Sequence, residues 1–198
     1  MISASVFERS RLKIEIRKYL DFIKEVEGLK SVTRTAWMKS GRQESTAEHS
    51  WRLALFAAIV ARQFPELDHG KVLFMSLVHD LGERYSGDQS AVLLPDKLEK
   101  TKEEEFAIKK LASFLPEEIG HHIIDVCKEY NEGVTKEAVL VKALDKAETI
   151  IQHNQGKNPP DFDYEFNLTY GLKYFEQEPF LISLRAELDR ETRYKLNQ

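Results

Sequence analysis

The stretch LVHDLGERYSGD, residues Leu77 to Asp88, places a histidine and three acidic residues at and beyond the end of an apolar segment. His79 and Asp80 are adjacent, and Glu83 follows His79 by four residues, so on a helix these side chains would share a face. An imidazole and two carboxylates among Leu and Val side chains are costly to bury unless they are paired or bind a cation. The stretch therefore indicates a divalent-metal site. The alternative is a hydrogen-bonded pair at the end of a helix.

Two further segments supply candidate ligands from elsewhere in the chain. The segment TAEHSW contains His49, and the segment VKALDKAETII contains Asp145 on a mostly apolar helical pattern. Each has an ordinary alternative interpretation. His49 could be a solvated histidine at the start of a helix, and Asp145 could be an ion-pair partner of Lys142 or Lys146.

Taken together, the four candidates form a plausible ligand set for one ion. Two imidazoles and two carboxylates suit a divalent ion such as Mn, Fe, Co, Ni or Zn. A water bound to such an ion can become a nucleophile near neutral pH. Glu83 lies one helical turn away and Asp88 one short loop away, and either could accept a proton from that water or orient it. The predicted metal ligands are His49, His79, Asp80 and Asp145.

Apolar residues recur at helical spacing along most of the chain, which predicts an all-α fold of about seven or eight helices. Ser45 and Glu48 have the spacing of a capping box at the start of one of them, and Thr135 is the expected N-cap of the helix over 136–153. The polar segment 30–44 is predicted to be a loop. The expected helices span about 11–27, 45–64, 69–84, 95–114, 116–130, 136–153, 167–176 and 179–196.

Length and composition limit the classes of function. The chain has 198 residues, 42% of them hydrophobic and 31% charged, which fits one globular domain. The net charge of −4 argues against a nucleic-acid polymer as partner. The longest apolar run, Leu53 to Ala61, is too short to span a membrane. The single cysteine, Cys127, is expected in the core, and a cytoplasmic location is the simplest interpretation.

The order H…HD…D of the candidate ligands resembles the signature of the HD-domain superfamily of metal-dependent phosphohydrolases. The segments around His49, His79 and Asp145 are similar to those of the bacterial 5′-deoxynucleotidases and their close relatives. The resemblance implies a single HD domain over 1–198, with a core at about 29–154 and C-terminal helices within 160–196 packed on it. It also implies that the four candidates bind one divalent ion.

The same resemblance assigns roles to residues near the ion. Glu83 and Asp88 match acidic residues that take part in catalysis, and Arg34 matches an arginine that contacts the substrate phosphate. The sequence departs from the bacterial pattern in one place, because the tryptophan is not adjacent to the arginine but three residues on, at Trp37. Trp37 packs against the sugar or base of the substrate, or it belongs to the core. Selectivity for 2′-deoxyribose is therefore an open question.

The implied activity is hydrolysis of nucleoside 5′-monophosphates, with or without a 2′-hydroxyl, to a nucleoside and phosphate. Two alternatives stay open: another phosphate ester, such as a cyclic nucleotide or a nucleoside triphosphate, or a metal-stabilised module that binds a nucleotide without catalysis. Relatives of this type are commonly dimers, so a homodimer is expected. His121 and His122 are interpreted as surface residues, and the charged segment 95–115 is either a solvated helix face or a lid.

Overall fold

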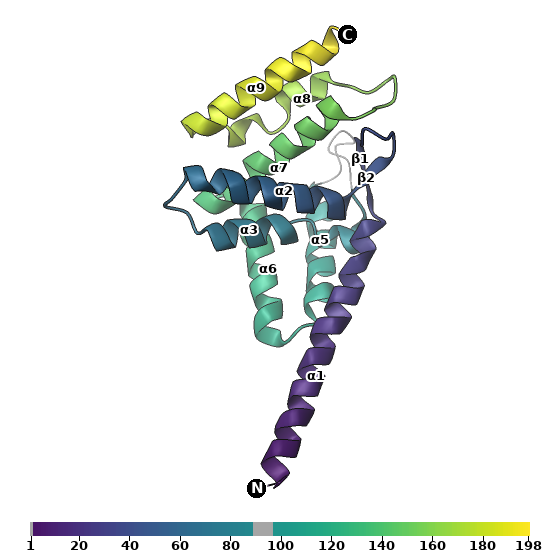
Figure 1. The fold of residues 1–198 in the computed structure, drawn as a ribbon, viewed down its shortest axis with the longest axis vertical. Helices are drawn as coiled ribbons and strands as arrows, with labels where there is room; N and C mark the ends of the chain where they lie inside the picture. Colours follow the sequence, from purple (N-terminus) through teal and green to yellow (C-terminus); the bar gives the residue numbers. More distant parts are fainter. Residues whose placement is uncertain (1, 89–96) are drawn as a thin grey trace.

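The computed structural model describes residues 2–88 and 97–198 and confirms the all-α class, with a single small hairpin as the only sheet in these residues (Figure 1). None of the helices in these two ranges combines the length and apolar character of a membrane span. The elements are α1 Ile2–Val26, η1 Glu27–Lys30, β1 Thr33–Trp37, β2 Gln43–Ser45, α2 Thr46–Val60, η2 Ala61–Gln63, α3 His69–Val78, α4 Glu83–Ser86, α5 Lys97–Ala112, α6 Glu117–Glu132, α7 Lys136–Gln155, α8 Glu165–Thr169, η4 Leu172–Tyr174 and α9 Pro179–Leu196.

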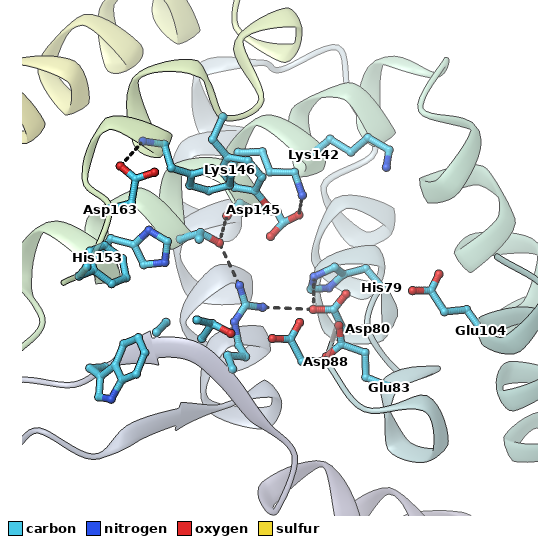
Figure 2. A pocket seen from close by; sticks show the side chains of 18 of the residues that line it. His79, Asp80, Glu83, Asp88, Glu104, Lys142, Asp145, Lys146, His153 and Asp163 are labelled. Atoms are coloured by element: carbon cyan, nitrogen blue, oxygen red, sulfur yellow. Dashed lines mark hydrogen bonds and ion pairs between the residues drawn. The ribbon is translucent and has the colours of Figure 1, made fainter. Parts of the chain in front are cut away.

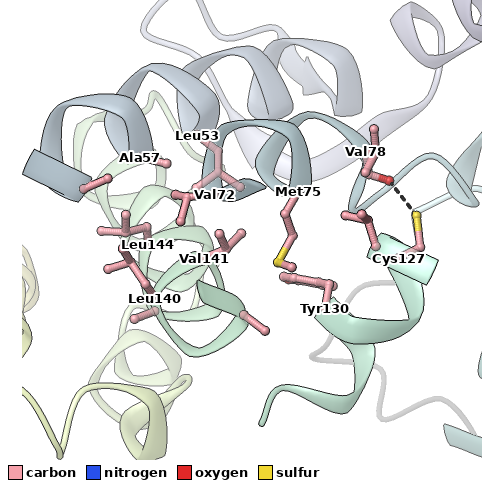
Figure 3. Packing of buried hydrophobic residues seen from close by; sticks show 14 of the residues in the cluster. Leu53, Ala57, Val72, Met75, Val78, Cys127, Tyr130, Leu140, Val141 and Leu144 are labelled. Carbon is pink, nitrogen blue, oxygen red and sulfur yellow. Dashed lines mark hydrogen bonds between the residues drawn. The ribbon is translucent and has the colours of Figure 1, made fainter. Parts of the chain in front are cut away.

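Helix α7 forms the centre of the molecule, and α2, α3, α6 and α9 pack around it. Figure 3 shows apolar side chains of α2 and α3 meeting those of α7 in the core. Burial of this apolar surface is the main source of stability, at about 25 cal/mol per Å². The same helix also carries buried polar side chains, so it lies between the core and the site described below.

Helix starts are set by side chains that accept hydrogen bonds from free backbone N–H groups. Ser45 and Glu48 form both bonds of the predicted capping box at the start of α2. Thr135 caps α7 as its position predicts, and Asp68 caps α3. The cap at Ser45 places His49 in the first turn of α2, where its side chain points inward and is completely buried.

The prediction of a loop over 30–44 was wrong, because the segment contains the hairpin of β1 and β2. Thr33 lies opposite Ser45 and Trp37 opposite Gln43, and the reversal includes Gly41 at φ +84°. The period-two alternation is short and interrupted, which conceals it in the sequence. The hairpin matters for the site because it fixes the position of Arg34 on β1.

The prediction of one helix over 69–84 was also wrong in part. Helix α3 ends at Val78, His79 occupies the cap position, and a short turn leads to α4. A Cβ on Gly82 would lie 3.2 Å from the carbonyl oxygen of Glu104, so the turn packs closely against α5. This break moves Glu83 off the axis of α3 while keeping it next to Asp80.

The first helix is longer than predicted, and the helix predicted over 167–176 is shorter than predicted. Helix α1 begins at Ile2 and extends away from the other helices (Figure 1). Between residues 11 and 26 most of its apolar side chains are exposed, with Ile23 at 63%. The helix expected at 167–176 is instead the short α8 and a single 3-10 turn. Helix α9 matches its predicted range and packs on α7. Residues 95 and 96 of the helix expected at 95–114 lie outside the described residues.

Candidate metal centre

The fold brings the four predicted metal ligands together from three helices. His49 comes from the first turn of α2, His79 and Asp80 from the end of α3, and Asp145 from the middle of α7. The Nε2 atom of His49 lies 3.2 Å from Oδ1 of Asp145 and 3.8 Å from Oδ2 of Asp80. The Nε2 atom of His79 lies 3.0 Å from the same Asp80 oxygen. Figure 2 shows three of the four, His79, Asp80 and Asp145.

The hydrogen bonds of the two histidines fit a shared cation. Among the described residues, neither His49 nor His79 has a hydrogen-bond partner for its buried Nε2 atom. Both Nδ1 atoms are engaged, that of His79 with the carbonyl of Ser76 at 3.0 Å and that of His49 with Glu148. A carbonyl only accepts, so Nδ1 of His79 carries the proton and its Nε2 lone pair is available. Unpaired buried nitrogens are costly, and a divalent ion between them would satisfy both.

Asp145 combines the two roles that its sequence position suggested. Its Oδ2 atom accepts hydrogen bonds from the hydroxyl of Tyr130 at 2.6 Å and from Nζ of Lys146 at 2.8 Å. Its Oδ1 atom faces His49. The ion pair with Lys146 is therefore present, but it leaves one carboxylate oxygen free to bind a metal.

Charges around the centre shift several pKa values. Burial raises the pKa of Asp145, but Lys146 and the histidines outweigh it and hold that pKa well below its usual range. Burial and Arg34 lower the pKa of His49, but Glu148 and Asp145 prevail and raise it to about 10. A metal ion that binds here must therefore displace a proton, as metal sites of this ligand type do.

Glu83 and Asp88, the predicted catalytic acids, lie beside Asp80 at the mouth of the site (Figure 2). Glu83 is buried and accepts a hydrogen bond of 2.8 Å from the hydroxyl of Thr46. Burial raises the pKa of Glu83 well above its usual range, and the negative charges of Asp80 and Asp88 add to the shift. A carboxylate with a raised pKa takes up a proton more readily than an ordinary glutamate, which suits a proton acceptor.

Arg34 approaches the ligands from β1, so the structure places it where a metal-bound anion could reach it. Its Nη1 atom lies 3.4 Å from Oδ2 of Asp80, and its Nη2 atom donates to Thr149 at 3.0 Å. Its Nε atom is buried without a hydrogen-bond partner among the described residues. Burial lowers the pKa of Arg34, but Asp80 and the other acids outweigh it and raise the pKa above its usual value. The guanidinium therefore stays charged.

A cavity of about 660 Å³ connects this charged region with a group of aromatic side chains. Trp37 lines the cavity, and its ring meets that of Phe162 edge to face, with ring centroids 6.0 Å apart. Phe162 in turn contacts the ring of His153, and Phe166 and Tyr170 continue the aromatic wall. Trp37 is thus a cavity residue, only partly buried.

The structure confirms the interpretation of three residues and shows that a further histidine is part of the interior. His153 lies in the last turn of α7, where it is buried, and its Nδ1 atom lies 2.7 Å from Oδ1 of Asn167. His121 and His122 are exposed, as predicted. Cys127 is buried in the core, also as predicted, and its thiol donates to the carbonyl of Val78.

Sequence reasoning missed several residues that surround the ligands. The buried Glu148 forms an ion pair with the partly exposed Arg52 next to His49, and Glu44 lies close to both Arg52 and Arg34. The spacing held a usable signal, because Arg52 follows His49 by three residues and Glu148 follows Asp145 by three. Residues three apart on a helix lie on the same face.

Comparison with known proteins gives a consistent result. A family model described as HD domain matches residues 26–181. The chain is 35% identical over 150 residues to 5′-deoxynucleotidase HDDC2 of Dictyostelium discoideum, covering 72% of this chain and 79% of that protein. It is 30% identical over 181 residues to the Homo sapiens protein of the same name, covering 88% of this chain and 86% of that protein.

A solved structure shows the same fold. The chain from Magnetospirillum magnetotacticum, titled a predicted metal-dependent phosphohydrolase, superposes with a TM-score of 0.75 at 24% identity, covering 90% of this chain and 97% of that one. The family match spans both histidine segments, the Asp145 segment and most of the helices that position them. The chain belongs to the HD-domain family.

Proposed function

We propose that this protein is a metal-dependent phosphohydrolase that converts nucleoside 5′-monophosphates to nucleosides and phosphate. One observation carries the proposal: a single cavity is lined by Arg34, by three of the four candidate metal ligands and by an aromatic wall. A nucleotide has the matching polarity, with an anionic phosphate at one end and a flat base at the other. The curated relatives named 5′-deoxynucleotidase support the same reaction.

His49, His79, Asp80 and Asp145 would hold one divalent ion, of which Mn, Co, Fe, Ni and Zn suit the ligand types. When bound, the ion supplies a Lewis acid and lowers the pKa of a coordinated water. Arg34 binds the phosphate, because its planar fork of N–H donors can hold two phosphate oxygens. Its Nε atom forms an ion pair with Glu44 at 3.7 Å, which holds the guanidinium in place.

Glu83 is the proposed proton acceptor. It takes a proton on its carboxylate as the water oxygen attacks phosphorus and the bond from phosphorus to the 5′-oxygen breaks. That proton is then passed to the departing 5′-oxygen, so the products are a neutral nucleoside and hydrogen phosphate. Thr46 holds the Glu83 carboxylate in place through its hydrogen bond. Asp88, close enough to shift the pKa of Glu83, orients the water or assists the transfer.

Trp37 is proposed to contact the sugar or base of the substrate. It and Phe162 form an edge-to-face pair, and both line the cavity. Aromatic rings there would stack on a nucleobase with an energy of about 1–3 kcal/mol per base. A preference for 2′-deoxyribose is part of the proposal because curated relatives carry that name.

The test is phosphate release from protein stripped with a chelator and then supplied with Mn, Co, Fe, Ni, Zn or Mg one at a time. The substrates are matched pairs of ribonucleoside and 2′-deoxyribonucleoside 5′-monophosphates. We expect metal-dependent release of phosphate. Absence of release with every metal would contradict the proposal. Cyclic nucleotides and nucleoside triphosphates would then be tried, and tight nucleotide binding without turnover would identify a binding module.

Three broader proposals accompany this function. The chain forms a single domain over 1–198, supported by the packing of α9 on α7. It acts in the cytoplasm, supported by a lone, buried cysteine.

The chain is also proposed to form a homodimer, supported by apolar side chains that are exposed on α1, α2 and α3. These are Leu12, Ile16, Leu20 and Ile23 on α1, Trp51, Leu55 and Ile59 on α2, and Leu73 and Leu77 on α3.

Exposed apolar side chains at four-residue spacing form stripes that a second copy could cover. Sedimentation velocity of the unmodified protein is expected to give a dimer. Ile16→Glu on α1 and Leu55→Glu on α2 identify which stripe is covered, because the charge disrupts only an interface that buries it. A monomer at all concentrations would contradict the homodimer.

A further inference from the structure

The ring of His49 is held on the side opposite its free Nε2 atom by one carboxylate. The Nδ1 atom of His49 lies 2.5 Å from Oε2 of Glu148, and both side chains are almost completely buried, at 0% and 1% exposed. A carboxylate accepts, so Nδ1 donates its proton to Glu148, and Nε2 is the nitrogen at which a metal ion would displace a proton and bind. Glu148 therefore determines which nitrogen of His49 is available.

The second oxygen of Glu148 is held just as closely. The Nε atom of Arg52 donates to Oε1 at 2.5 Å, and its Nη2 atom forms an ion pair with the same oxygen. The Nη2 atom also donates to the main-chain carbonyl of Glu148 at 3.3 Å. Both carboxylate oxygens are thus engaged, and the Glu148 side chain has one orientation in which all these bonds form.

Helix geometry explains why the two pairs meet. Arg52 follows His49 by three residues on α2, and Glu148 follows Asp145 by three on α7. Each helix therefore presents a ligand and its neighbour on one face, and α2 packs against α7. The contact between the helices places Glu148 between His49 and Arg52.

The other histidine is held differently. Nδ1 of His79 donates to the main-chain carbonyl of Ser76, three residues earlier at the end of the same helix. No side chain is needed for that orientation. His49 is therefore the histidine whose position can be altered by changing a side chain outside the ligand set.

Glu44, His49 and Glu148 also form a group with the spacing of metal ligands, but their charges are already balanced. Arg52 is paired with Glu148, and Nη2 of Arg52 lies 3.9 Å from Glu44. The Nε atom of Arg34 lies 3.7 Å from the other Glu44 oxygen. The two guanidinium groups already neutralise the charges of Glu44 and Glu148. These two carboxylates therefore pair with the arginines and His49 and do not form a second metal site.

We propose that Glu148 is a positioning residue for the metal site and that Arg52 acts through it by holding its carboxylate. The inference rests on the metal site proposed above. A carboxylate behind a ligating histidine fixes the ring and raises its basicity, and loss of such a partner typically weakens metal binding about 10- to 100-fold. Glu148 reaches no substrate; its effect passes through His49.

The experiment measures metal affinity directly, without any substrate. Glu148→Gln keeps the size of the side chain but removes the charge and leaves one accepting oxygen where His49 and Arg52 require two. The dissociation constant for Zn and Co is measured by competition with a chromophoric chelator, and the absorption spectrum of the Co-loaded protein reports the ligand geometry. We expect affinity about 10- to 100-fold weaker and an altered Co spectrum.

Asn154→Ala is the matched control, because Asn154 is also a buried polar residue of α7. It contacts Asn167 and Thr192 and not the metal ligands. We expect a lower melting temperature with unchanged metal affinity. Equal loss of affinity in this control would overturn the proposal, as would unchanged affinity in folded Glu148→Gln.

Arg52→Gln is a second variant that tests the proposal. Because the Arg52 side chain is partly exposed, this substitution should disturb folding less than Glu148→Gln. We expect a smaller loss of affinity, and no further loss when it is combined with Glu148→Gln, because both act through one bond. If Glu148→Gln does not fold, unchanged affinity in Arg52→Gln overturns the proposal. Failure of the protein to hydrolyse any phosphate ester would contradict the proposed function and would leave these affinities equally measurable.

Discussion

The guanidinium of Arg34 lies 3.4 Å from the carboxylate of Asp80, although the two residues are 46 positions apart and come from a strand and the end of a helix. Asp80 is a candidate metal ligand, so the charged fork of Arg34 lies at the edge of the metal site. An anion bound to the ion could therefore also contact Arg34. This relationship defines the phosphate end of the cavity and leads to the first prediction.

Arg34→Lys is expected to lower kcat/KM about 10- to 100-fold, with KM accounting for much of the change. Lysine keeps the charge but cannot bind two phosphate oxygens in a plane, and one charged hydrogen bond is worth about 1.5–3 kcal/mol. Steady-state kinetics on a nucleoside 5′-monophosphate measures the effect. Arg42→Lys is the control, since Arg42 is exposed and pairs with Glu48 outside the cavity. Equal losses in both variants would contradict the role of Arg34.

Asp80→Ala is expected to abolish metal binding and turnover while keeping the helical content. Asp80 is partly exposed at the end of α3, so its removal leaves no core cavity. A ligand at 100 times its dissociation constant stabilises a protein by about 2.7 kcal/mol, which for this size raises the melting temperature by about 5–10 °C. Unmodified protein should show that rise with added metal, and Asp80→Ala should not.

The control for this variant is Asp161→Ala, which removes an exposed carboxylate that lines the cavity away from the metal ligands. It should keep both the metal content and the metal-induced rise in melting temperature. Metal content after dialysis is measured by mass spectrometry. Full turnover in Asp80→Ala would show that Asp80 is not a ligand of a catalytic metal ion.

Glu83→Gln is expected to keep the metal and to lose about 10²-fold or more in kcat, the scale of general acid–base catalysis. Because burial, Asp80 and Asp88 raise the pKa of Glu83, its carboxylate form grows as pH rises through a range above that of an ordinary glutamate. The rate of the unmodified enzyme should therefore rise with pH over that range. The variant should lack this rise. An identical pH–rate profile in both proteins would remove Glu83 from the mechanism.

Trp37→Ala is expected to weaken binding of nucleotides more than binding of a base-free sugar phosphate. Loss of one stacking contact costs about 1–3 kcal/mol, or roughly 5- to 150-fold in affinity. The comparison uses KM for a 2′-deoxynucleoside 5′-monophosphate and for 2-deoxyribose 5-phosphate. Equal changes for both substrates would show that Trp37 contacts the sugar or supports the cavity wall, and not the base.

The buried imidazole of His153 is expected to make the free energy of unfolding depend on pH. Burial lowers its pKa in the folded state, although its bond to Asn167 opposes the shift. The unfolded chain therefore binds a proton at higher pH than the folded one, so this stability is present above the unfolded pKa of about 6.5 and is lost as pH falls below it. The melting temperature should fall more between pH 7.5 and 5 in the unmodified protein than in His153→Gln. Parallel curves would contradict this account.

The predicted helices around the core agree with the structure because their signals are local. The capping box at Ser45 and the cap at Thr135 satisfy backbone groups within a single turn, whatever the rest of the chain does. Helix α1 shows the limit of such reasoning. Its apolar periodicity indicates a helix, but periodicity cannot say whether another element covers the stripe, and most of it is exposed.

The sequence by itself determined the helical class, most helix starts and the four candidate ligands, because residue type and spacing along the chain carry that information. Only the tertiary structure decided that β1 brings Arg34 to Asp80, that His153 is buried in the cavity wall, and that Glu148 supports His49. His49 and Glu148 are 99 positions apart. Their contact exists because α2 packs against α7, and helix packing depends on the shapes of many side chains at once.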